Sequence, residues 1–162
     1  MRAAPDRSDL RLRAASFLVE MGRAAEAVRL TEDAARAMPE NREILLMRAT
    51  TLEFARRTEE AGDLLKQIER RWPEWPAGWA AHGIILAGHE HYAEARQALE
   101  AATALGSRNG EIHFFLAKTY EALGLKQEAK AAREKVPQNL SESAWLSRVF
   151  QGSLLHDEAA RP

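Results

Sequence analysis

Three consecutive residues, His89, Glu90 and His91, carry the side chains that most often bind metals or move protons. A zinc site needs about four convergent ligands, and neighbouring residues in a turn point apart. The HExxH spacing, which places two histidines on one helix face, is absent. We therefore interpret this segment as an exposed polar turn and expect no metal site.

Nucleophilic chemistry has equally little support. The chain has no cysteine, and its few serines lie near expected helix boundaries or on helix surfaces. No glycine-rich phosphate loop and no nucleophile elbow is present. The carboxylates alternate with arginines, as helix-surface pairs do. We predict that the chain is not an enzyme and needs no cofactor.

Composition narrows the classes of partner. The 23 basic and 24 acidic residues give a net charge of −1, without the basic excess of most nucleic-acid binders. No apolar run approaches the roughly 18 residues of a membrane span, so neither nucleic acid nor membrane is expected as a partner. No signal peptide is visible, which slightly favours a cytoplasmic location and otherwise leaves the location unknown.

The elements that position these residues follow from a repeat. Shifting the sequence by 34 residues aligns several columns without insertion or deletion. One column is always Glu-Ala, one is always small and one is always large. They comprise Glu26-Ala27, Glu60-Ala61, Glu94-Ala95 and Glu128-Ala129; Ala15, Ala49, Gly83 and Ala117; and Leu18, Leu52, Leu86 and Tyr120.

This pattern predicts pairs of antiparallel helices. Small side chains allow two helices to approach closely, and Ala61 is expected at such a contact. Ala35 is expected farther out, on the outer part of a second helix. Gly22 and Gly124 fall where turns between paired helices are needed, and prolines end the second helices.

The third unit resembles the tetratricopeptide repeat family most closely. Trp79, Gly83, Leu86, Tyr92 and Ala95 stand at the spacing and residue types of that family. The resemblance implies an all-α fold, a right-handed α-solenoid of four 34-residue helix-turn-helix repeats plus a C-terminal capping helix. The units are expected at 8–41, 42–75, 76–109 and 110–137, within a single domain 1–162.

Some residues depart from the family pattern. Arg48 and His82 stand where the family prefers leucine. We expect His82, and also His113 on the next first helix, to be core histidines, with a pH-sensitive contact as the alternative. Trp72 and Trp75 flank a unit junction, where they either pack across it or act as exposed interface anchors.

The two ends differ. After Pro137, Asn139 and Glu142 form a capping-box-like pair, and apolar residues follow at helical spacing. We interpret 140–155 as a helix that covers the last repeat, and 156–162 as a mobile tail. The first repeat has no such cap, so its outer face is expected to be exposed, or covered by another subunit in a homo-oligomer.

In this family the first helices line a concave groove. Among the family's groove positions, apolar and acidic residues predominate and Lys118 is the only basic one. A partner with apolar and basic residues would fit. The candidate partner-binding residues are Leu12, Val19, Leu46, Glu53, Phe54, Ile84, Phe114, Lys118 and Glu121. Two alternatives stay open: partial burial of the apolar residues between helices, and occupation of the groove by the chain's own C-terminal helix.

The resemblance thus implies a non-catalytic scaffold or adaptor for a peptide or protein, in the style of bacterial relatives. The alternative is a regulatory or targeting domain excised from a larger enzyme or assembly factor. A single lysine among acids does not suit the clamp that some family members use for anionic chaperone tails. The acidic groove also disfavours RNA binding.

Overall fold

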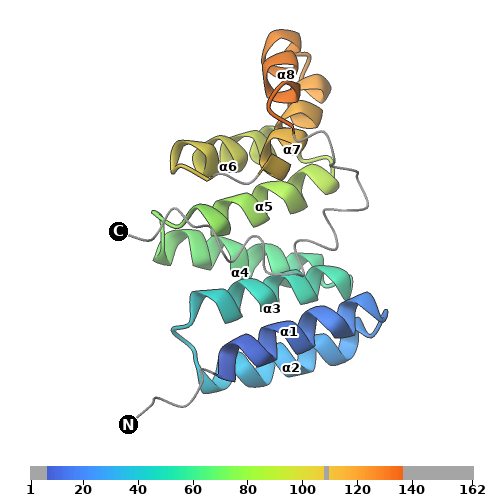
Figure 1. The fold of residues 1–162 in the computed structure, drawn as a ribbon, viewed down its shortest axis with the longest axis vertical. Coiled ribbons are helices and arrows are strands. Elements are labelled where there is room, and N and C mark those ends of the chain that lie inside the picture. Colours follow the sequence, from blue (N-terminus) through green and yellow to red (C-terminus); the bar gives the residue numbers. More distant parts are fainter. Residues whose placement is uncertain (1–6, 108–109, 137–162) are drawn as a thin grey trace.

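The structure is a computed structural model that describes residues 7–107 and 110–136. The described part holds eight α-helices and no strand, so the all-α prediction is confirmed. Consecutive helices form antiparallel pairs that stack along one axis (Figure 1). The helices are α1 (Arg7–Glu20), α2 (Ala24–Ala37), α3 (Arg42–Phe54), α4 (Thr58–Arg71), α5 (Pro76–Gly88), α6 (Tyr92–Ala104), α7 (Gly110–Ala122) and α8 (Lys126–Arg133).

The small column of the repeat lies where paired helices touch. Ala15 and Ala49 are fully buried, and Ala117 is nearly so. At Gly83 a Cβ atom would lie 2.6 Å from Cγ of Leu99 and 3.0 Å from its backbone nitrogen. Glycine is therefore required at Gly83 by the close approach of α5 and α6.

The turn inside each pair has the same backbone geometry in all four repeats. Gly22, Arg56, Glu90 and Gly124 stand 34 residues apart, and each has a left-handed φ between 62° and 75°. The next residue donates its N–H to a carbonyl five residues back, at 2.8–2.9 Å. This is a Schellman closure, which satisfies carbonyls at the end of the first helix. The accepting residues are Leu18, Leu52, Leu86 and Tyr120, which form the large column of the repeat.

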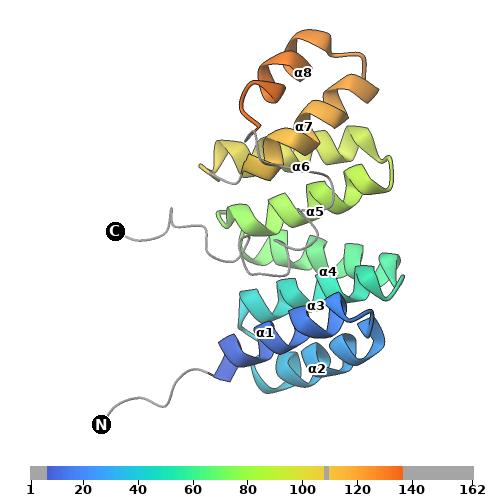
Figure 2. The same cartoon turned by 45° about the vertical axis from the view of Figure 1, so that its right-hand side comes forward.

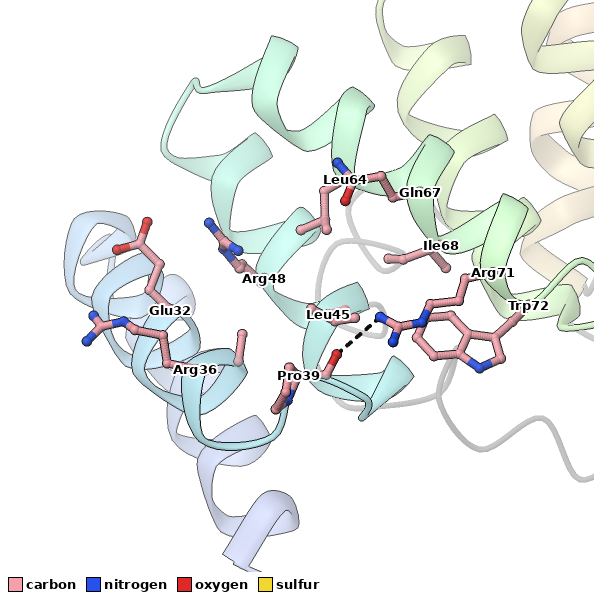
Figure 3. Close-up of a pocket in the computed structure, with 11 residues that line it drawn as sticks. Glu32, Arg36, Pro39, Leu45, Arg48, Leu64, Gln67, Ile68, Arg71 and Trp72 are labelled. Atoms are coloured by element: carbon pink, nitrogen blue, oxygen red, sulfur yellow. Dashed lines mark hydrogen bonds between the residues drawn. The ribbon is translucent and has the colours of Figure 1, made fainter.

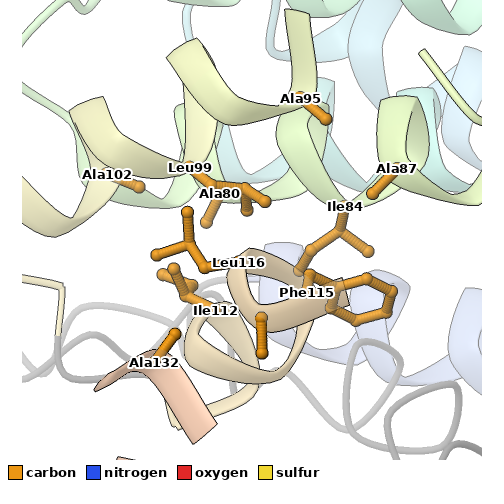
Figure 4. Packing of buried hydrophobic residues seen from close by; sticks show 11 residues of the cluster. Ala80, Ile84, Ala87, Ala95, Leu99, Ala102, Ile112, Phe115, Leu116 and Ala132 are labelled. Carbon is orange, nitrogen blue, oxygen red and sulfur yellow. The ribbon is translucent and has the colours of Figure 1, made fainter. Parts of the chain in front are cut away.

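The core runs through the stack as a series of clusters. In the C-terminal cluster Ile84, Leu99, Ile112, Phe115 and Leu116 are all less than 5% exposed. Figure 4 shows these side chains from α5, α6 and α7 directed toward one another. Apolar side chains are therefore buried both within each pair and between one pair and the next, as in other repeat proteins.

The N-terminal pair leaves apolar side chains in solvent. Leu10, Phe17 and Met21 are 59–62% exposed, and all lie on or just after α1. This agrees with the expectation of an exposed outer face on the first repeat. The predicted capping helix 140–155 and tail 156–162 lie outside the described residues.

Candidate functional site

The first helices of the pairs form a row, which is the candidate binding face. Contacts join α1 to α3, α3 to α5, and α5 to α7. Figures 1 and 2 show α1 and α3 side by side in both views, with α5 farther along the stack. The small residue in each first helix allows the second helix of the pair to pack closely behind it. The first helices of successive pairs are then in contact with one another.

Four of the predicted groove residues are buried in this arrangement. Leu12 and Val19 are 8% and 9% exposed, and Leu46 and Ile84 are 2% and 1% exposed. Each belongs to a core cluster. Because successive first helices pack directly together, these side chains form the floor of the face, and direct contact with a partner stays a prediction for them.

Two aromatic residues remain accessible on the face. Phe54, at the end of α3, is half-buried and packs against the cluster of Val19 and Ala27. Phe114, on α7, is half-buried and meets Phe115 edge to face, with ring centroids 5.3 Å apart. Partly exposed rings held in a fixed orientation are suited to anchoring a partner.

The charged candidates have partners within the protein. Oε1 of Glu53 accepts a hydrogen bond from Nε2 of His89 at 2.6 Å. Glu121, at the end of α7, forms an ion pair with Arg133 of α8. Lys118 is half-buried on the same helix as Glu121. The acids of the face are therefore partly neutralised, which sequence reasoning did not anticipate.

His82 has a buried partner that sequence reasoning missed. Its Nδ1 lies 2.7 Å from Oε1 of Glu69 on α4, and both side chains are about 90% buried. This satisfies the expectation of a core histidine. The sequence does signal His82, because a polar residue stands there at a position where the family prefers leucine. Its partner Glu69 lies on the preceding helix pair and belongs to no motif, so the pairing itself was not predicted.

The tryptophans at the junction pack rather than project. Trp75 is 6% exposed, with the guanidinium of Arg42 4.8 Å from its ring centroid. Trp79 donates from Nε1 to the carbonyl of Pro73 at 2.9 Å. Trp72 is half-buried beneath Arg71.

Titratable groups elsewhere are structural. Burial, and secondarily the charge of Lys135, lowers the pKa of His113. Burial and the hydrogen bond to Glu100 raise the pKa of Tyr120 to about 12, so its hydroxyl acts as a donor.

His89, Glu90 and His91 are exposed, as predicted. Within residues 7–107 and 110–136 no group of three or more His, Asp or Glu side chains is placed to hold a metal ion. In the same part of the chain, no helix has the length and apolar character needed to span a bilayer.

Comparison with protein families decides the assignment. Two sequence profiles, each described as tetratricopeptide repeat, match residues 18–85 and 80–139. The chain belongs to the tetratricopeptide repeat family. The Schellman closures, small columns and stacked pairs are thus the repeat architecture of this family.

Solved structures with a similar fold include several of MamA. MamA residues 41 to the end from Desulfovibrio magneticus RS-1 aligns with a TM-score of 0.67 and 19% identity, over 83% of this chain and 76% of that one. A MamA RS-1 double mutant aligns at 0.66 and 16% identity, over 98% and 100%. MamA AMB-1 aligns at 0.61 and 21% identity, over 85% and 77%. At these identities the likeness concerns the fold. No curated protein sequence matches the chain.

Proposed function

We propose that this chain is a non-catalytic protein–protein interaction module that binds a peptide or protein segment along the face of its first helices. The observation that carries the proposal is membership of the tetratricopeptide repeat family over most of the chain. In addition, half-buried aromatic rings lie on first helices whose neighbours form a firmly packed floor.

The partner has apolar anchors with basic residues beside them. Phe54 and Phe114 supply the apolar contacts, since aromatic side chains in fixed orientations contribute most of the affinity at interfaces. Glu53 and Glu121 outnumber Lys118 and favour a basic segment, although His89 and Arg133 reduce that preference. Charges of this kind mainly set the association rate and orientation.

A peptide-display selection on the folded chain tests this. We expect enriched peptides to combine Leu, Ile or Phe with Arg or Lys. Changing Phe114 to Ser should weaken binding by at least about tenfold, because an interface anchor contributes 2 kcal/mol or more. Glu121→Gln should weaken binding far less, because exposed ion pairs contribute about 0–1 kcal/mol.

The matched control is Gln97→Ser, an exposed position on the second helix α6. It should leave binding unchanged, and circular dichroism should show that all variants are folded. Enrichment of acidic peptides, or binding that is indifferent to Phe114, contradicts the proposal.

A second function is favoured by the exposed residues of the first pair. Leu10, Phe17 and Met21 are spaced seven and four residues apart, which places them on one side of α1 and of the turn that follows it. We propose that this surface, the α1 stripe, pairs with a second copy of the chain. The alternative occupant is a neighbouring domain of a larger enzyme or assembly factor, in which this chain would be a regulatory or targeting unit.

A further inference from the structure

A cavity of about 530 Å³ opens between the second helices α2 and α4, away from the residues of the proposed binding face. Figure 3 shows α2 on one side, α4 on the other, and α3 between them as the floor. Apolar side chains from Leu45, Leu64, Ile68 and Trp72 line one part of it. Such a volume and lining are typical of binding pockets.

The other part of the cavity is rich in arginine. Arg36, Arg48 and Arg71 line it together with one acid, Glu32. Oε1 of Glu32 accepts from Nη1 of Arg57 at 3.4 Å, and Arg57 does not line the cavity. Arg36 pairs with Asp33, and Arg71 pairs with Glu40. Nε of Arg48 is buried and has no hydrogen-bond partner among the described residues.

The repeat explains why Nε of Arg48 has no hydrogen-bond partner. A shift of 34 residues takes Arg48 to His82, and the same shift takes Ala35 to Glu69. In the third repeat, His82 is 2.7 Å from Glu69 on the preceding second helix. In the second repeat, that position on the preceding second helix is Ala35, which is 6% exposed and lines the cavity. Ala35 is therefore not the outer surface position that the sequence predicted, because it packs in the core cluster with residues of α1 and α3.

We propose that this cavity binds an acidic segment of a partner protein, with a carboxylate at Arg48 and an adjacent apolar side chain against Trp72 and Leu45. The buried Nε–H of Arg48 has no acceptor, which favours a ligand that supplies one, and a carboxylate is the best-matched acceptor for a guanidinium. The lining has three arginines and one glutamate, which gives the same preference through charge complementarity, although the ion pairs of Arg36 with Asp33 and of Arg71 with Glu40 reduce it.

A polypeptide fits the shape of this opening. The rim residues Arg36 and Arg71 are 75% and 44% exposed, so a chain can lie across the mouth while two side chains enter. The site is separate from the basic-peptide face proposed above and has the opposite charge preference. The module would then hold two different segments at once.

A random peptide library displayed on phage tests the site. Selection on the full chain is carried out with an excess of soluble Ala35→Glu chain, which removes peptides that bind elsewhere. The new carboxylate should pair with Arg48 inside the protein, as the carboxylate of Glu69 pairs with His82. We expect the surviving peptides to carry Asp or Glu beside Leu, Phe or Trp.

Synthetic, terminally blocked versions of these peptides are then measured by titration calorimetry. Replacing the peptide's Glu by Gln, or Arg48 by Leu, should weaken binding by about tenfold or more, the value of a charged hydrogen bond. Phe114→Ser should leave this binding unchanged, although it disrupts the other face. Arg48→Met provides a second test if the leucine variant does not fold.

Three results overturn the proposal. The first is enrichment of basic or uncharged peptides, and the second is the absence of peptides that distinguish the wild type from Ala35→Glu. The third is loss of self-association in Ala35→Glu, because the occupant would then be a second copy of this chain.

Discussion

Two residues hold a backbone conformation that suits glycine better. Arg56 and Glu90 have φ values of 62° and 64°, at the turn position that Gly22 and Gly124 occupy in the outer repeats. For a residue with a Cβ, this conformation costs roughly 1–2 kcal/mol. The Schellman hydrogen bonds that follow each turn hold it in place. The backbone of the second and third repeats is therefore strained at this turn position, whereas glycine removes that strain in the first and fourth repeats.

Replacing either residue by glycine should stabilise the fold. We expect Arg56→Gly and Glu90→Gly each to raise the free energy of unfolding by up to about 1 kcal/mol, because relief of strain exceeds the entropy that glycine adds to the unfolded chain. Urea unfolding followed by circular dichroism measures this. The matched control, Gly124→Ala, should change stability in the opposite direction, and equal signs for the two changes would contradict the strain argument.

The helices α5 and α6 approach each other closely at Gly83. A Cβ at Gly83 would lie within 3.0 Å of three atoms of Leu99, one of them in the backbone. Leu99 is fully buried, so it has no space into which to move. The pairing distance of these two helices therefore depends on one missing methyl group.

Gly83→Ala should destabilise the protein by about 1–3 kcal/mol through overpacking. Gly62→Ala, inside α4, is the matched control, because a Cβ there meets no atom within 4 Å. The control should instead stabilise by about 0.5–1 kcal/mol, since alanine favours helix over glycine. Thermal melting compares the two, and similar melting temperatures would show that the approach at Gly83 is not tight.

The helix pairs could be predicted from the sequence, because the small column at Ala49 and Gly83 and the turns at Gly22 and Gly124 are local signals. The candidate site was predicted less well. Burial of Leu46 depends on how one first helix approaches the next, which no local pattern specifies. The pairing of Glu53 with His89 joins residues 36 positions apart, and neither stands out as half of a pair.

For the whole molecule, the two faces of the first pair differ. One packs against the second pair, whereas the α1 stripe of Leu10, Phe17 and Met21 remains in water. Solenoids usually need a polar outer surface at each end to remain soluble on their own. An apolar terminal stripe is typical of a contact surface.

Phe17→Asp should therefore reduce self-association. We expect the wild-type chain to show a sedimentation coefficient that rises with protein concentration, and the variant to remain monomeric. Gln97→Asp on α6 adds the same charge at an exposed position and should behave like the wild type. A wild-type chain that is monomeric at all concentrations would instead favour attachment of the stripe to a neighbouring domain.

The pair formed by His82 and Glu69 makes the units non-interchangeable. Removing residues 42–75 would leave the 34-residue register intact, yet His82 would then stand opposite Ala35 with no acid to meet it. Duplicating the same unit would instead place a second Arg48 opposite a Glu69, creating an ion pair in place of a cavity. Gain or loss of a whole unit thus changes which polar groups are satisfied, so the order of the repeats matters to the stability of the stack.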